Sequence, residues 1–175
     1  MNDYKNVVPP KFHHVKYETD VSEIIKATCA AQLKLKKGLF LVGDTGAGKT
    51  HVAYAIAKRM IEEGHKVRFY NTGEFLDLLR REFNNPPEDG GLFQEIMDYD
   101  GTLFFDDIGA EQPSTWVVER LYLIINKKYE QMRPMFFTTN CTKDQLVKIL
   151  GDRTVSRINA MTVQVRIPGG DRRKQ

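Results

Sequence analysis

Short apolar runs alternate with longer amphipathic stretches along this chain. We interpret the apolar runs as strands, because brief runs of aliphatic, β-branched and aromatic residues bounded by polar or turn residues are typical of strands buried in a sheet. The last run alternates apolar and polar positions, which indicates a half-exposed edge strand. The predicted strands are residues 39–42, 67–70, 102–107, 135–140 and 162–167.

The stretches between these runs carry apolar residues at helical spacing. Ser22 or Asp20 is a candidate cap for the first helix, and Gly64 is expected to end the second. Helices that alternate with strands predict an α/β fold, in which three αβα layers enclose a mainly parallel five-stranded sheet. The predicted helices are residues 21–35, 52–60, 73–82, 92–99, 115–129 and 143–150.

Two segments show neither pattern. Residues 1–20 contain Pro9 and Pro10 and few aliphatic side chains, so we expect an extended linker before a single domain over 21–175. Adjacent histidines in this linker lack further metal ligands, which favours a solvated segment over a metal site. Residues 84–91 hold too many helix and strand breakers for a regular element, so we expect a mobile surface loop.

The composition is that of an ordinary globular protein, with 28% charged and 41% hydrophobic residues among 175. No apolar run is long enough to cross a bilayer, and the first residues lack a signal-peptide pattern, so we expect a cytoplasmic protein without a membrane partner. Cys29 and Cys141 are expected to be reduced core residues. A net charge of +3 is compatible with nucleic acid but too small to establish it.

The segment from Gly43 to Thr50 matches G-x-x-x-x-G-K-[ST] in full, between a predicted strand and a predicted helix. Glycines let backbone N–H groups approach phosphates, the helix N-terminus adds free donors, and Lys49 adds a charge. The Thr50 hydroxyl is expected to hold Mg²⁺. A glycine-rich turn without a ligand is the alternative. The nucleotide-binding candidates are Gly43, Asp44, Thr45, Gly46, Ala47, Gly48, Lys49, Thr50 and His51.

Two other predicted strands end in polar side chains, and ligands of parallel α/β sheets lie beyond the carboxyl ends of the strands. Asp106 is the candidate Mg²⁺ ligand, and Asp107 is the candidate for polarising an attacking water. The Asn140 amide can hydrogen-bond a γ-phosphate oxygen and that water. The alternatives are an aspartate that caps a helix and an asparagine that only forms a turn.

Basic side chains lie in two further regions. Arg153 and Arg157 are candidates for an arginine delivered to a neighbouring subunit's γ-phosphate, with a surface or salt-bridged arginine as the alternative. Arg120, Lys127 and Lys128 lie on the helix predicted over 115–129. They could face DNA, although charges at such positions commonly form a solvated face.

Together these motifs resemble the AAA+ ATPase core of bacterial and phage replicative helicase loaders (DnaC/DnaI type) and the related IstB transposition ATPases. The Asp-Asp-x-Gly-Ala-Glu form of the second motif is the specific part, because most AAA+ proteins have Asp-Glu there. The resemblance covers roughly residues 9–173 and rests on residues 43–50, 104–111, 138–140 and 151–158.

The resemblance implies an AAA+ P-loop fold and a role for each matching position. These positions are Lys49 and Thr50 for phosphates and Mg²⁺, Asp106 for Mg²⁺, Asp107 for water activation, Asn140 as sensor 1, Arg157 as the arginine finger with Arg153 as runner-up, and Arg172 as sensor 2.

The same resemblance implies an ATPase that binds ATP or ADP with Mg²⁺ and hydrolyses slowly until it assembles into a ring or filament with Arg157 acting in trans. A replicative helicase and single-stranded DNA are the implied partners. Such loaders carry a separate N-terminal domain that binds the helicase, whereas this chain begins almost directly at the core. It is therefore interpreted as an isolated core or as a compact relative with a different partner.

Two other functions compete with this reading. One is an IstB-like transposition helper or nucleotide-switched binding module, in which hydrolysis is vestigial; Asp107, one methylene shorter than the usual glutamate, leaves this open. The other is a small P-loop kinase, which gives no reason for the positions of Asn140 and Arg157.

Overall fold

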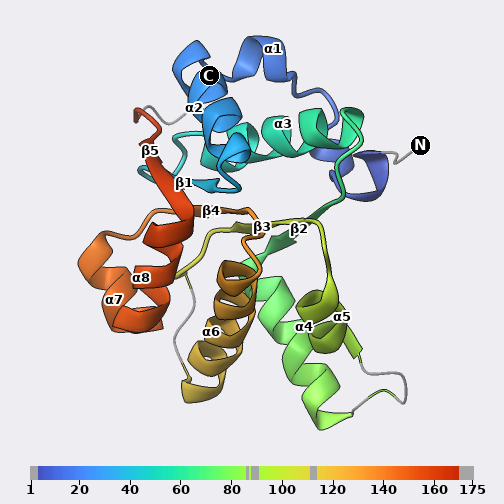
Figure 1. Ribbon diagram of the computed structural model, residues 1–175, viewed down its shortest axis with the longest axis vertical. Helices are drawn as coiled ribbons and strands as arrows, with labels where there is room; N and C mark the ends of the chain where they lie inside the picture. Colours follow the sequence, from blue (N-terminus) through green and yellow to red (C-terminus); the bar gives the residue numbers. More distant parts are fainter. Residues whose placement is uncertain (1–3, 86, 88–90, 111–113, 170–175) are drawn as a thin grey trace.

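The computed structural model describes residues 4–85, 87, 91–110 and 114–169. Five strands form a single sheet in the order β2-β3-β4-β1-β5, and every neighbouring pair is parallel (Figure 1). The predicted fold class is confirmed, and the last strand occupies an edge as its alternating pattern indicated. The strands are β1 (Gly38–Val42), β2 (Val67–Asn71), β3 (Thr102–Asp106), β4 (Met135–Thr139) and β5 (Thr162–Arg166).

Helices cover both faces of the sheet. The first three α-helices lie on one side, and the other five lie on the opposite side (Figure 1). Two 3₁₀ turns, η1 (Tyr4–Asn6) and η2 (Pro10–Phe12), precede them. The α-helices are α1 (Tyr17–Asp20), α2 (Glu23–Lys34), α3 (Lys49–Glu62), α4 (Thr72–Asn84), α5 (Gly91–Asp98), α6 (Thr115–Glu130), α7 (Lys143–Leu150) and α8 (Asp152–Met161).

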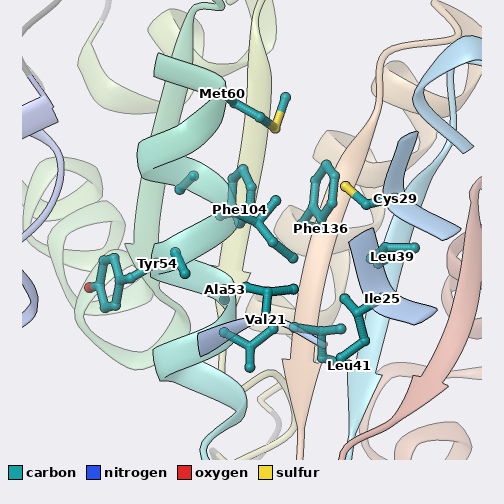
Figure 2. Packing of buried hydrophobic residues seen from close by; sticks show 14 of the residues in the cluster. Val21, Ile25, Cys29, Leu39, Leu41, Ala53, Tyr54, Met60, Phe104 and Phe136 are labelled. Atoms are coloured by element: carbon teal, nitrogen blue, oxygen red, sulfur yellow. The ribbon is translucent and has the colours of Figure 1, made fainter. Parts of the chain in front are cut away.

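Side chains of the central strands alternate between two hydrophobic cores. In β1, Leu39 and Leu41 pack with α2 and α3, whereas Phe40 packs with the helices of the opposite face. The same alternation places Phe104 and Phe136 in the first core, where Figure 2 shows them beside the side chains of α3. Because both faces are covered, the strands read as nearly continuous apolar runs in the sequence.

Aromatic rings fix α3 on the sheet in a continuous stack. Ring centroids are 4.4 Å apart between Phe136 and Phe104, and 5.4 Å apart between Phe104 and Phe69. Tyr54 of α3 lies 3.8 Å from Phe69 and 4.4 Å from Phe12 of η2. The stack therefore joins β4, β3, β2, α3 and the first turns of the chain.

The predicted extended conformation is wrong for residues 4–20. This segment forms η1, η2 and α1, and the side chains of Val8 and Val15 are buried in the core shared with α3. Pro10 is the first residue of η2, where its fixed φ suits a helical turn and its missing N–H is not needed. Two prolines therefore begin a helical turn here instead of an extended linker.

A second difference is α8, which the sequence reading did not predict. Gly151 separates it from α7, with a φ of 80° that favours glycine. In the segment predicted to be an irregular loop, Asn84 ends α4 and Gly91 begins α5. Residues 86 and 88–90 of that predicted loop lie outside the described residues.

Lys128 is fully buried, so it does not belong to a DNA-facing or solvated surface. Its Nζ donates hydrogen bonds to the carbonyl oxygens of Met97 and Tyr99, at 3.1 and 2.6 Å, and so satisfies acceptors at the end of α5. Within the described parts of the chain, none of the helices has the length and apolar character needed to cross a membrane.

Candidate active site

The segment between β1 and α3 has the backbone geometry of a phosphate-binding loop. Gly46 and Gly48 have φ values of 82° and 92°, in the left-handed region that favours glycine. Gly48 is the N-cap of α3. Because glycine has no side chain that could accept a hydrogen bond, the first N–H groups of the helix are left without a side-chain cap beside the loop. A helix N-terminus of this kind is a ready anion site.

Lys49 is the first residue of α3, and its side chain extends across the loop. Its side chain is buried, and its Nζ donates hydrogen bonds to the carbonyl oxygens of Gly43 and Asp44, each at 2.9 Å. These bonds hold the ammonium group over the residues that would surround a phosphate. The structure therefore places the Lys49 ammonium group within the loop.

Asp106 ends β3 directly opposite Thr50. The Thr50 hydroxyl donates to both oxygens of its carboxylate at 3.0 Å, and the Thr138 hydroxyl donates to Oδ1 at 2.6 Å. Burial raises the pKa of Asp106 above its ordinary value, while the bonds from Thr138 and Thr50 act in the opposite direction. A carboxylate beside a hydroxyl is a set of hard oxygen ligands, which fits Mg²⁺.

Asp106→Asn is expected to raise the unfolding temperature of the Mg²⁺-free protein at pH 7. A carboxyl with a raised pKa in the folded state stabilises the fold below its unfolded pKa, and loses this contribution as the pH rises through the folded pKa. The asparagine variant does not ionise, so its stability does not fall in this way as the pH rises. Thermal unfolding between pH 3.5 and 7 should show the difference growing with pH. A variant less stable than the wild type at pH 7 would contradict the burial argument.

Asp107 has a φ of 58°, an unusual value that aspartate tolerates better than most residues. Its backbone N–H donates to the Thr138 hydroxyl at 2.8 Å, and the N–H of Ile108 donates to the Thr138 carbonyl at 2.9 Å. Thr138 thus holds both acidic residues in position. The sequence reading identified its strand end but assigned a role only to Asn140. A hydroxyl residue in a buried apolar strand was the available signal.

Asn140 follows β4, and its side-chain Nδ2 donates to the Thr45 hydroxyl at 3.3 Å. This contact joins two residues that are 95 positions apart in the chain. Parallel pairing of β1 with β4 and of β4 with β3 brings their carboxyl ends together. The structure therefore gathers the loop, Asp106, Asp107 and Asn140 at one edge of the sheet, as the strand-end argument predicted.

His51, the residue after Thr50, contacts the preceding helix α1. Its Nε2 lies 2.9 Å from Asp20 Oδ2. A hydrogen bond from the backbone N–H of Lys16 is the main cause that lowers the pKa of Asp20 to about 2, and His51 and Thr19 contribute to the shift. The pair fastens α1 to the first turn of the helix that carries the loop.

Asp20→Asn is expected to destabilise the fold by about 0.5 kcal/mol at pH 7, as is usual for partly exposed pairs. A carboxyl with a lowered pKa stabilises the fold above its unfolded pKa, and that contribution disappears as the pH falls toward the folded value of about 2. Urea unfolding of the wild type and the variant measures this difference in stability at pH 7 and its expected disappearance at pH 2.5. An equal difference at the two pH values would refute a stabilising role of the ionised Asp20 carboxylate.

Of the candidate arginines, the structure describes Arg153 and Arg157, and both lie on α8 and not in the phosphate loop or at a strand end. Arg157 lies on α8, where its Nε donates to the Asn126 side chain of α6 at 2.6 Å. Arg153 is exposed near the start of the same helix. Arg172 lies outside the described residues.

Comparison with known proteins places this geometry in context. The family model described as IstB-like ATP binding protein matches residues 12–164. The replicative helicase loader DnaI of Bacillus subtilis (strain 168) is 29% identical over 152 residues, which are 78% of this chain and 48% of that protein. This chain spans about half the length of the curated relatives it matches.

Solved structures share the fold. A crystal structure of the DnaC helicase loader superposes with a TM-score of 0.77 at 22% identity, covering 91% of this chain and 99% of that one. The replication initiator DnaA bound to AMPPCP and single-stranded DNA gives a TM-score of 0.76 at 18% identity, covering 92% of this chain and 51% of that one. At these identities the likeness establishes the fold alone.

Proposed function

Because this chain belongs to the IstB-like ATP-binding protein family, we propose that it is an AAA+ ATPase that binds ATP with Mg²⁺ and hydrolyses it in an assembly of several copies. The observation that carries the proposal is the gathering of Lys49, Thr50, Asp106 and Asn140 at the carboxyl edge of the sheet. Phosphoryl transfer relies on positioning and on charge stabilisation, and these residue types supply both.

Each residue has a defined task in this proposal. The N–H groups at the start of α3 and the Lys49 ammonium bind the phosphates, while Thr50 and Asp106 hold Mg²⁺, whose charge offsets that of the phosphate oxygens. The Asp107 carboxylate accepts a hydrogen bond from the attacking water. The Asn140 amide orients that water toward the γ-phosphate, and it already contacts the loop through Thr45.

Arg157 is proposed to complete the site of a neighbouring copy. Among the described residues, its hydrogen bond goes to Asn126 of α6 and not to a residue of its own chain's phosphate loop. An arginine supplied in trans makes hydrolysis depend on self-association, so turnover per subunit should rise with protein concentration. This dependence distinguishes the proposal from a small P-loop kinase, which needs no second copy.

A replicative helicase and single-stranded DNA are the proposed partners. The printed name of the B. subtilis relative, a replicative helicase loader, supports the first. The structural neighbour DnaA bound to single-stranded DNA supports the second. We propose that the nucleotide state of the assembly controls its hold on these partners.

Turnover of ATP with and without single-stranded DNA tests the function. The ATPase proposal expects turnover that rises with protein concentration and is lost in Asp107→Asn, while nucleotide binding persists. The match to the IstB-like family favours a second candidate, a nucleotide-switched transposition helper. A rate that stays negligible at all concentrations, with and without DNA, would favour that switch and refute the ATPase.

A further inference from the structure

Three side chains on one face of α6 surround Arg157. Its Nε donates to Asn126 Oδ1 at 2.6 Å, and its guanidinium carbon lies 5.8 and 5.6 Å from the ring centroids of Tyr122 and Tyr129. These residues are spaced by four and three positions, so they form one stripe of the helix. The Arg157 guanidinium group is therefore held by contacts between α8 and α6.

The amide of Asn126 has a fixed orientation. Its Nδ2 donates to Glu130 Oε1 at 2.8 Å, one helical turn further along α6. An asparagine side chain carries a donor and an acceptor on the same carbon, and either can face a neighbour. Because Glu130 can only accept and Arg157 can only donate, the two partners together select the orientation in which Oδ1 faces Arg157.

Within the described parts of the chain, the Arg157 guanidinium group forms its hydrogen bond through Nε, and neither terminal nitrogen forms one. Among the residues that the structure describes, no carboxylate forms an ion pair with Arg157, whereas other surface arginines such as Arg59 and Arg80 do. A planar guanidinium fixed through Nε presents its two terminal groups as a fork, which matches phosphate geometry. Among the described residues, Arg157 is therefore not a salt-bridged structural arginine.

We propose that Asn126, oriented by Glu130, is the positioning residue that presents Arg157 to the γ-phosphate bound by a second copy of this chain. This inference rests on the proposed function. A free arginine side chain loses rotamer entropy when it is fixed, so holding it in advance reduces the entropy that is lost when it contacts phosphate. Loss of the Asn126 contact is therefore expected to affect turnover in the assembly and not nucleotide binding.

The test compares Asn126→Ala, Glu130→Ala and Glu130→Gln with Arg157→Ala. ATP turnover is measured at protein concentrations that span self-association, and nucleotide affinity is measured separately with a fluorescent ATP analogue. Asn126→Ala should lower kcat about 10-fold, with KM and affinity unchanged. Glu130→Ala should lower kcat less, and Glu130→Gln should keep the wild-type rate, because its amide oxygen still accepts from Asn126. Glu119→Ala, an exposed position of α6, is the matched control.

A double variant separates positioning from a general effect on α6. If Asn126 acts through Arg157, then adding Asn126→Ala to Arg157→Ala should cause no further loss of kcat. An additional 10-fold loss in the double variant, or a raised KM in Asn126→Ala, would overturn the positioning role. Thermal unfolding checks that α6 stays folded. If Asn126→Ala unfolds, the comparison of Glu130→Ala with Glu130→Gln decides the question.

The outcomes also distinguish this inference from the function on which it rests. Normal turnover in Arg157→Ala at high protein concentration would refute the trans-acting arginine, and the inference with it. A collapse of turnover in Arg157→Ala beside a wild-type rate in Asn126→Ala would leave the proposed function standing and overturn the inference alone.

Discussion

ATP binding should fall at least 100-fold when Lys49 is replaced by alanine. The ammonium group is expected to exchange its two bonds to the carbonyls of Gly43 and Asp44 for bonds to phosphate oxygens. Phosphate oxygens carry a negative charge and the carbonyls do not, and a net gain of about 3 kcal/mol from this exchange corresponds to about 100-fold in affinity. Isothermal titration with ATP and Mg²⁺ measures the loss.

The Lys49 experiment needs proof that the fold survives. Lys143→Ala removes an exposed lysine at the start of α7 and should bind ATP as the wild type does. Thermal unfolding of both variants checks that only the loop has changed. Retention of affinity within threefold in a folded Lys49→Ala protein would refute the assignment of the loop as the phosphate site.

Arg157→Ala should reduce turnover of the assembled protein by about 10³-fold, since arginine fingers contribute about 10³–10⁵ to the rate. Nucleotide affinity should not change, because the structure places Arg157 against α6 and not beside its own chain's loop. Single-turnover measurements at saturating ATP separate the two quantities. Arg153→Ala, on the exposed side of the same helix, is the comparison that decides between the two candidate arginines.

Mixing two inactive variants gives a direct test of action between copies. Lys49→Ala keeps Arg157 but does not bind ATP, and Arg157→Ala binds ATP but lacks the arginine. If the arginine acts in trans, their equimolar mixture should regain a sizeable fraction of wild-type turnover. A mixture as inactive as its components, in a sample that self-associates as the wild type does, would contradict a composite site.

The strands and most helices could be predicted from local pattern. The apolar run before the phosphate loop became β1 with a boundary one residue earlier, and the helix predicted over 143–150 matches α7. These elements are governed by nearby residues and by burial on both faces of the sheet. The parallel direction of the strands could be predicted from the alternation of strands with helices, whereas their order in the sheet was not predicted.

Two elements could not be predicted in this way, for different reasons. The segment that forms α8 follows α7 after the single residue Gly151, so no longer breaker or loop pattern in the sequence separates a second helix there. The turns over 4–20 depend on distant partners, because the burial of Val8 and Val15 against α3 stabilises a segment with weak local preferences. Tertiary packing overrides propensity in such segments.

Some residues of the candidate site could be predicted from the sequence, and others could not. Motif positions at strand ends identified Lys49, Asp106 and Asn140, because a parallel sheet brings its carboxyl ends together. The structure brings these three residues together, and the chemical roles assigned to them, as well as those of Asp107, Arg157 and Arg172, stay predictions. The contact of Asn126 with Arg157 and the pair of His51 with Asp20 span 31 positions each and leave no sequence pattern. Only the folded geometry reveals them.

The hydrogen bonds around Thr138 run in a single direction. An amide N–H can only donate, so the Thr138 oxygen accepts from Asp107, and its one proton is left for Asp106. The Thr50 hydroxyl likewise donates its proton to Asp106, so the lone pairs of its oxygen are left to accept or to coordinate a cation. The Asp106 carboxylate thus accepts a hydrogen bond from each of the two threonine hydroxyls. Binding a cation there requires no proton to leave the protein from either threonine.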